Sequence, residues 1–98
     1  MYGTVADLRI KSGKENEVLD LMRQWEEDRK PSIKGAIATY AYKLDEDPNR
    51  WALAVVFEDR ESYRKNAEDP GQDAWYQQFR ELLEEDPVWK DGEIVYNS

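Results

Sequence analysis

The sequence predicts an α+β fold in which a four-stranded antiparallel sheet and two helical units follow the order β-α-β-β-α-β. Two segments carry apolar residues at helical spacing, and short β-prone runs separate them. One of these runs, residues 51–57 (WALAVVF), is apolar on both faces, which is typical of a strand covered on both sides. A chain of 98 residues has room for one hydrophobic core, so we expect residues 1–98 to form a single domain.

The beginning of the chain predicts a strand followed by a helix. Residues 2–10 (YGTVADLRI) are β-prone and predict the first strand. Ser12 and Glu15 have the spacing of a capping box, in which a hydroxyl and a carboxylate bond free amides at a helix start. We expect the helix to end at Pro31, since proline lacks an amide proton and its ring clashes with the preceding turn. The apolar stripe of this helix consists of Val18, Leu21, Met22 and Trp25.

A β-hairpin is predicted next. After Gly35, residues 36–44 read as a strand whose alternate residues share one face. These residues are Ala36, Ala38, Tyr40, Tyr42 and Leu44. The polar run 45–50 predicts the hairpin tip, and residues 51–57 form the third strand.

Two capping signatures divide the second helical unit. Asp59 is the expected cap of a short helix over about residues 60–67. Asp69 caps a further helix with Pro70 at its first position, and this helix is predicted to reach about Glu85. Its expected buried residues are Ala74, Trp75, Phe79, Leu82 and Leu83. The dipeptide Asp91-Gly92 predicts a tight turn before a last strand at residues 93–96.

The element order is the split β-α-β pattern of ferredoxin-like folds. Right-handed crossovers place the first and third strands in the centre and both helical units on one face of the sheet. The other face of the third strand is also apolar, so it needs cover that this chain does not supply. A second copy of the chain is the simplest cover and predicts a homodimer through the sheet face; the alternative is an apolar sheet face left in water.

Composition excludes several function classes. A net charge of −8 repels phosphate groups, so we expect no nucleic-acid partner and no binding to an anionic membrane. The chain has no Cys and no His, which excludes disulfides, thiolate nucleophiles and the commonest neutral metal ligand, and we expect no metal. The sequence shows no signal-peptide pattern and no apolar run of membrane-spanning length, so we expect a cytoplasmic protein.

Four short motifs carry a family resemblance. They are Tyr2-Gly3-Thr4-Val5-Ala6, the turn Lys11-Ser12-Gly13-Lys14, Gly35 before the second strand, and the corner Phe57-Glu58-Asp59-Arg60-Glu61-Ser62-Tyr63. With the element order, they resemble the antibiotic biosynthesis monooxygenase family of dimeric α/β barrels over essentially the whole chain. The resemblance implies two sheets packed face to face in a dimer, with a pocket between sheet and helices in each subunit. It also implies a monooxygenase that oxidises an aromatic or polyketide-like small molecule with O2 and without a cofactor.

Candidate catalytic residues follow on the two helices of the second unit. In related oxygenases an Asn on the short helix bonds a substrate oxygen, which indicates Asn66, with Tyr63 three residues earlier on the same face as a substrate-binding residue. Asn66 could instead be a solvated helix cap. Tyr76 and Arg80 lie four apart on the next helix, where a cation beside an apolar wall can stabilise an oxyanion. Arg80 could equally pair with nearby carboxylates, and Tyr76 could close the core.

Large aromatic residues are the candidate walls of the ligand pocket. Trp75, Phe79, Tyr40 and Trp51 lie on stripes expected to face inward, where they either pack the core or surround a planar ligand. Asp7, in the first strand, could act as a base for a phenol if it points into the pocket, or it could form a surface pair with Arg9.

Two other functions stay open at this point. One is a non-catalytic dimeric module that binds a small ligand, and the other is an isomerase or cyclase on the same barrel. Haem degradation, which some relatives carry out with a His iron ligand, is not expected because the chain has no His.

Overall fold

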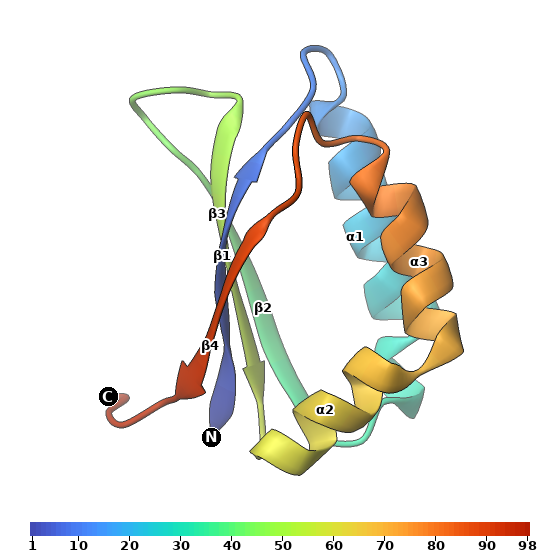
Figure 1. Ribbon diagram of the computed structural model, residues 1–98, viewed down its shortest axis with the longest axis vertical. Helices are drawn as coiled ribbons and strands as arrows, with labels where there is room; N and C mark the ends of the chain where they lie inside the picture. Colours follow the sequence, from blue (N-terminus) through green and yellow to red (C-terminus); the bar gives the residue numbers. More distant parts are fainter.

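Strands and helices follow one another along the chain in the predicted order. The computed structural model describes residues 1–98, and Figure 1 shows the sheet on one side and the helices on the other. The elements are β1 (Tyr2–Arg9), α1 (Glu15–Asp28), the 3-10 turn η1 (Lys30–Ser32), β2 (Ala36–Lys43), β3 (Arg50–Phe57), α2 (Arg60–Glu68), α3 (Pro70–Arg80) and β4 (Val88–Glu93). The predicted α+β, ferredoxin-like β-α-β-β-α-β fold is confirmed.

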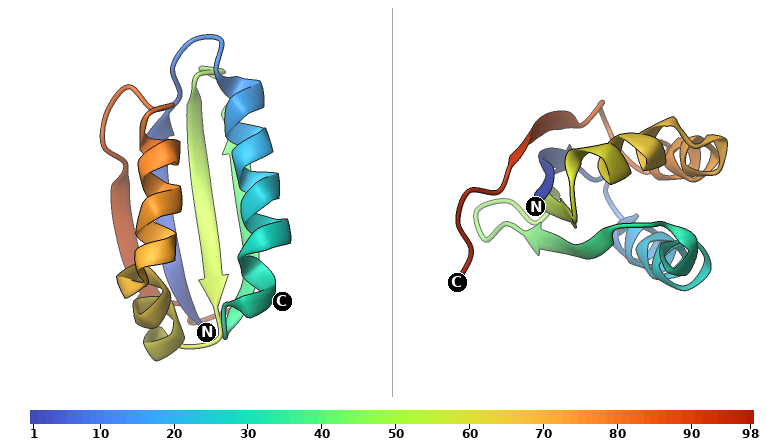
Figure 2. Two further views of the ribbon diagram at one scale, coloured as in Figure 1. Left: turned by 90° about the vertical axis from the view of Figure 1, so that its right-hand side faces the viewer. Right: turned by 90° about the horizontal axis from the view of Figure 1, so that it is seen from below.

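The sheet has the order β2-β3-β1-β4, and all neighbouring strands are antiparallel. The first and third strands are therefore central, as the crossover rule predicts. Figure 2 shows that α1 and α3 run side by side along the strands, while α2 lies at one end of the same face. None of the helices is long and apolar enough to cross a membrane.

The hydrophobic core lies between the inner face of the sheet and the helices. On α1, Val18 and Leu21 are buried and Met22 packs against the same cluster, so the predicted stripe is confirmed. Burial of these side chains removes apolar surface from water and fixes the helix on the sheet. The core cluster consists of Ala6, Leu8, Ile10, Val18, Leu21, Trp51, Leu53, Phe79 and Leu83.

The start of α1 differs from the predicted capping box. The cap residue is Lys14, and no side chain bonds the free amides there. The Ser12 hydroxyl instead accepts a hydrogen bond from Asn49 Nδ2 at 3.2 Å, because the hairpin tip packs beside this turn. At the other end the helix stops at Asp28, and Pro31 lies in η1.

Both caps of the second helical unit are confirmed. Asp59 accepts a hydrogen bond from the Ser62 amide at 2.8 Å at the start of α2. Asp69 accepts one from the Gly71 amide at 2.7 Å, and Pro70 is the first residue of α3. A single residue therefore separates two independently capped helices.

The C-terminal part of the chain corrects two predictions. Helix α3 ends at Arg80, because the chain after it turns back and Leu83 pairs with Ile10. Ala74, expected in the core, is exposed. The last strand is Val88–Glu93, so Asp91 is a strand residue opposite Thr4, not part of a tight turn.

Strand β2 also departs from simple alternation. The pairing shifts between Ala36, which lies opposite Phe57, and Ala38, which lies opposite Val56. This bulge separates Ala36 from the face it was expected to share with Tyr40. Tyr40 lies opposite Ala54 on the face away from the helices and is 56% exposed, so the expectation that it faces inward is wrong.

The outer face of the sheet has no helix over it (Figures 1 and 2). Its large apolar side chains are more than half exposed: Val5, Tyr40, Tyr42 and Val88. Between them lie Ala52, Ala54 and Val56 of β3. The apolar second face predicted from the third strand is confirmed.

Candidate functional site

A pocket of about 740 Å³ lies between the inner face of the sheet and the helices. This volume is in the range of small-molecule sites, which are concave and mostly apolar with a few polar groups. Of 25 lining residues 15 are hydrophobic, and they come from every helix and strand of the fold. The pocket therefore has the size and composition to bind an aromatic molecule.

One wall of the pocket is made by aromatic rings of α3. Trp75 and Phe79 are stacked with ring centroids 5.2 Å apart and planes 13° apart. Tyr76 lies on the same helix, 6.2 Å from the ring of Trp89 on β4. The Trp75 indole donates to the Leu21 carbonyl at 3.1 Å, which fixes its orientation against α1. Burial raises the pKa of Tyr76 above its ordinary value of 10.0, with a contribution from Asp86, so its phenol is neutral at physiological pH.

The end of the pocket at α2 is polar. Tyr63 and Asn66 lie on the same side of α2, and Thr4 and Asp91 lie opposite each other on β1 and β4. The Tyr63 hydroxyl donates to Asp91 Oδ1 at 2.9 Å. Burial, reinforced by the bond to Asp91, raises the pKa of Tyr63 to about 12, so the phenol remains protonated.

Two polar atoms of this corner are buried without a hydrogen-bond partner. They are Asn66 Oδ1 and Thr4 Oγ1. An unpaired buried polar group costs about 1–3 kcal/mol, so such atoms are expected to have partners in the working protein. Both residues line the pocket, and a polar ligand group can supply the missing bonds.

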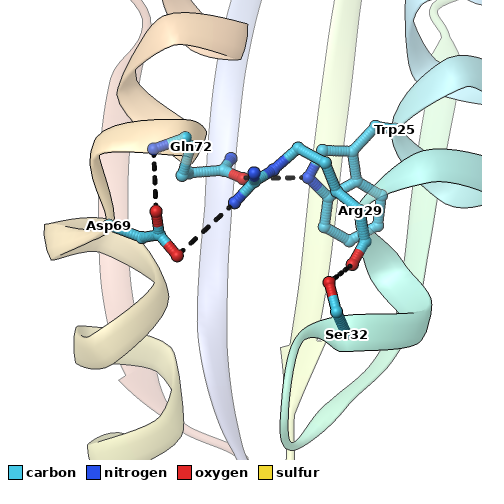
Figure 3. Close-up of polar contacts among 6 residues, drawn as sticks. Trp25, Arg29, Ser32, Asp69 and Gln72 are labelled. Atoms are coloured by element: carbon cyan, nitrogen blue, oxygen red, sulfur yellow. Dashed lines mark hydrogen bonds and ion pairs between the residues drawn. The ribbon is translucent and has the colours of Figure 1, made fainter.

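A polar bridge ties the end of α1 to the junction of α2 and α3 (Figure 3). Gln72 Oε1 accepts hydrogen bonds from Trp25 Nε1 at 2.9 Å and from Arg29 Nε at 3.2 Å. Arg29 also lies 3.9 Å from the Asp69 carboxylate that caps α3. Trp25 and Gln72 line the pocket, so this bridge links the two helices at its side.

The structure brings together five of the residues predicted for the site. Tyr63, Asn66, Trp75, Tyr76 and Phe79 all line the pocket. Arg80 does not. Its Nε donates to Asp86 Oδ1 at 2.6 Å and its Nη1 donates to the Leu83 carbonyl at 2.9 Å. The expectation that Arg80 faces the pocket is corrected, because the turn after α3 holds its side chain.

Three further candidates lie elsewhere. Trp51 is 3% exposed in the core, where its indole donates to the Pro48 carbonyl at 3.0 Å. Asp7 is on the outer face of β1, 3.5 Å from Lys90, so the condition for its role as a base is not met. Tyr40, as described above, is on the outer face as well.

Several lining residues are not evident from the local sequence. Thr4 and Asp91 are 87 positions apart in the chain and meet only through strand pairing, and Asp91-Gly92 reads locally as a turn. Trp89 was expected in a loop but lies in β4 opposite Ala6 and lines the pocket. Arg64, next to Tyr63 on α2, is a lining arginine that pairs with no carboxylate.

Several solved structures resemble this fold. SnoaB, a cofactor-independent oxygenase from Streptomyces nogalater solved as an asparagine-to-alanine mutant, aligns with a TM-score of 0.83 and 11% identity over 98% of this chain and 94% of that one. A conserved protein from Methanosarcina mazei Go1 has a TM-score of 0.80 and 18% identity over 93% and 89% of the two chains. An antibiotic biosynthesis monooxygenase has a TM-score of 0.76 and 18% identity over 98% and 100%. At these identities the likeness shows the fold.

The sequence itself shows the family. None of the curated protein sequences compared with the chain matches it significantly. The family model described as "Antibiotic biosynthesis monooxygenase", however, matches residues 1–78, which is well over half of the chain. The protein therefore belongs to the antibiotic biosynthesis monooxygenase family.

Proposed function

We propose that the protein is a cofactor-independent monooxygenase that oxidises an aromatic or polyketide-like small molecule with O2. The observation that carries this proposal is the pocket, whose aromatic wall on α3 leads to Asn66 with its buried, unpaired oxygen. Membership of the family supports it, as does the likeness in fold to SnoaB, itself a cofactor-independent oxygenase.

The proposed reaction needs an electron-rich ring and molecular oxygen. Loss of a proton from the phenolic substrate gives an anion that can transfer electrons to O2. The ring carbon para to the phenolic oxygen then becomes a carbonyl that keeps one oxygen atom, while the other oxygen leaves as water with the hydrogen of that carbon and the phenolic proton. The protein orients the ring and keeps bulk water out of the pocket.

Individual residues have separate proposed roles. Asn66 binds an oxygen substituent of the substrate through its side-chain amide, and Trp75 and Phe79 hold the ring. Tyr76 is a neutral hydroxyl donor. Arg64 takes the role that sequence reasoning gave to Arg80, since it lines the pocket without a carboxylate partner and can stabilise the developing anion.

Oxygen consumption tests this function. We would incubate the protein with 1,8-dihydroxyanthrone and with 1-naphthol in an oxygen electrode and identify the products. Wild-type protein should consume O2 with at least one of them, and Asn66→Ala should reduce kcat/KM at least about tenfold. Asn16→Ala, at an exposed position of α1, is the matched control and should leave the rate unchanged. Arg64→Gln should slow the reaction while Arg80→Gln does not. No uptake with either compound, or a wild-type rate for Asn66→Ala, contradicts the proposal.

The position of Arg80 favours a second candidate, a module that binds a small ligand without turning it over. The Asp86 carboxylate and the Leu83 carbonyl hold Arg80, so the strongest expected anion-stabilising group does not line the pocket. Tight binding of an aromatic ligand without O2 uptake identifies this function. Product formation in the absence of O2 identifies an isomerase or cyclase.

The outer face of the sheet supports a homodimer. Proteins of this family are typically dimeric. A second copy of this chain would bury Val5, Tyr40, Tyr42 and Val88, which are all more than half exposed. Light scattering after size exclusion should give twice the chain mass for the wild type. Tyr42→Glu should shift it toward the monomer, whereas Glu46→Gln in the hairpin tip should not. A monomeric wild type at micromolar concentration contradicts this arrangement.

A further inference from the structure

Thr4 occupies a central place at the polar end of the pocket. It lies in the middle of the sheet, with Val55 of β3 on one side and Asp91 of β4 on the other. Its side chain belongs to the inner face, lines the pocket, and leaves the residue only 5% exposed. Yet Thr4 Oγ1 has no hydrogen-bond partner. A threonine buried in an otherwise apolar strand face, with its hydroxyl unpaired, is an unfavourable arrangement unless a ligand completes it.

The ring of Tyr63 is held rigidly beside Thr4. It packs against Tyr2 with centroids 5.4 Å apart and against Phe57 at 5.5 Å in an edge-on contact. The Tyr63 hydroxyl gives its only proton to Asp91, so its oxygen has lone pairs left to accept a further bond. The Thr4 hydroxyl lies beside the Tyr63 phenol and lowers its pKa, which offsets part of the effect of burial.

The corner therefore offers mainly acceptors to a ligand. Tyr63 Oη and Asn66 Oδ1 can only accept there, and Thr4 Oγ1 can accept as well as donate. The carboxylate of Asp91, bonded to Tyr63, adds a negative charge that disfavours an anionic group at this end. A ligand group that fits must be an uncharged hydrogen-bond donor.

We propose that Thr4 and the Tyr63–Asp91 pair form a subsite for a neutral hydroxyl group of the ligand, and that Thr4 determines the specificity for it. This inference rests on the proposed function in taking the ligand to be aromatic. It narrows the class of ligand to aromatic compounds with a free, un-ionised hydroxyl group, and it places this hydroxyl at the α2 end of the pocket. In this arrangement the ligand hydroxyl donates to Thr4 Oγ1, the buried oxygen that lacks a partner, and the Thr4 hydroxyl can point its own proton to Tyr63 Oη. Asn66 remains available for a second oxygen substituent, which is the one that loses its proton in the proposed reaction.

The subsite predicts a specific order of affinities. A methyl ether of the same ring cannot donate, so it leaves Thr4 Oγ1 unpaired and should bind about 10- to 100-fold more weakly than the free hydroxyl compound. A carboxylate in the same position meets the charge of Asp91 and should also bind weakly. Both differences in affinity should depend on Thr4 and the Tyr63–Asp91 pair, and not on the aromatic wall of α3.

Anaerobic binding with isosteric variants tests the inference. The probes are 1-naphthol, 1-methoxynaphthalene and 1-naphthoate, measured by titration calorimetry at neutral pH without O2. Thr4→Val keeps the shape of the side chain and removes the unpaired hydroxyl, so the variant should fold at least as stably as the wild type. We expect it to reduce the preference for 1-naphthol over the ether to within about threefold. Thr39→Val, at another lining position on β2, is the matched control and should keep the full preference.

A second variant tests the charge. Asp91→Asn should strengthen naphthoate binding at least about fivefold, because the negative charge is removed while the bond from Tyr63 can be kept. An unchanged preference in Thr4→Val overturns the subsite, and so does failure of all three probes to bind the wild type at millimolar concentration. Since binding is measured without O2, the two proposals can fail separately. If Thr4→Val loses the preference for 1-naphthol but the wild type consumes no O2, the subsite is supported and the oxygenase function is contradicted. If the wild type consumes O2 but Thr4→Val keeps the preference, the oxygenase function is supported and the subsite is contradicted.

Discussion

Trp25 and Gln72 join the two long helices across the side of the pocket. The indole Nε1 of Trp25 donates to Gln72 Oε1 at 2.9 Å, although the residues are 47 positions apart in the chain (Figure 3). Arg29 donates to the same oxygen at 3.2 Å. One side-chain carbonyl thus accepts from two donors, one on α1 and one at its C-terminal cap, and links α1 to α3.

Replacing this acceptor should destabilise the protein. In Gln72→Leu the partly buried indole N–H of Trp25 loses its partner, so we expect the free energy of unfolding to fall by about 1–2 kcal/mol. Urea denaturation followed by tryptophan fluorescence measures it. Gln77→Leu, at an exposed position of the same helix, should change the free energy by less than about 0.5 kcal/mol. Equal effects at the two positions would show that the bridge contributes nothing.

Three glycines differ in backbone conformation and in the free space around them, so alanine substitutions at these positions should differ in their effect on stability. Gly35 has a φ of +84° at the start of β2, and a Cβ there would lie 2.7 Å from Ser62 Cβ on α2. Gly13 has a φ of +79° but open space around it, and Gly92 has neither constraint. We expect Gly13→Ala to cost about 1–2 kcal/mol, Gly35→Ala to cost more, and Gly92→Ala almost nothing. Thermal and urea unfolding give the order, and a Gly35→Ala variant as stable as Gly13→Ala contradicts it.

The cap of α2 should make stability depend on acid. The hydrogen bond from the Ser62 amide holds the pKa of Asp59 below its ordinary value of 3.8. The ionised Asp59 cap therefore makes its full contribution to the free energy of unfolding above pH 3.8, and this contribution is lost as the pH falls through the lowered pKa of the folded state. Asp59→Ala should lower the urea midpoint at neutral pH, and its difference from the wild type should shrink in acid. Asp59→Asn keeps a capping oxygen without a charge, so its midpoint should show less of this acid dependence.

Tyr63 should be the last tyrosine to ionise. Burial raises its pKa to about 12, so the folded state favours the neutral phenol; this stabilisation is present below pH 10.0 and is lost as the pH rises toward 12. A titration of tyrosinate absorbance should show this late step in the wild type and in Tyr96→Phe, but not in Tyr63→Phe. A complete titration of all six tyrosines near their ordinary value would contradict the burial of Tyr63.

Local signals predicted most of the fold. The stripe on α1 and the caps Asp59 and Asp69 depend on neighbouring residues only, and the structure confirms them. The errors arise where long-range pairing overrides local preference. Asp91-Gly92 has turn chemistry, but pairing with Thr4 and Gly3 extends it into β4. Helix α3 has helical spacing beyond Arg80, but the bridge between Leu83 and Ile10 ends it.

The candidate site was partly predictable for the same reason. Asn66 and Tyr63 share one face of a short helix, and Trp75 and Phe79 share one face of the next, so spacing alone groups each pair. Nothing in local spacing connects Thr4 with Asp91, because strand register brings them together. The direction of Arg80 depends on the turn after its helix, which supplies the two acceptors that hold it.

Because of the one-residue break at Asp69, two separate helices contribute different groups to ligand recognition. Helix α2 carries Arg64 and Asn66 at the polar end of the pocket, α3 carries the stacked rings of Trp75 and Phe79, and each helix has its own start signal. Changes in the chemical groups that the pocket accepts can therefore arise on one helix without altering the shape imposed by the other. In evolution or in the laboratory, polarity and shape selectivity of this pocket can be altered independently.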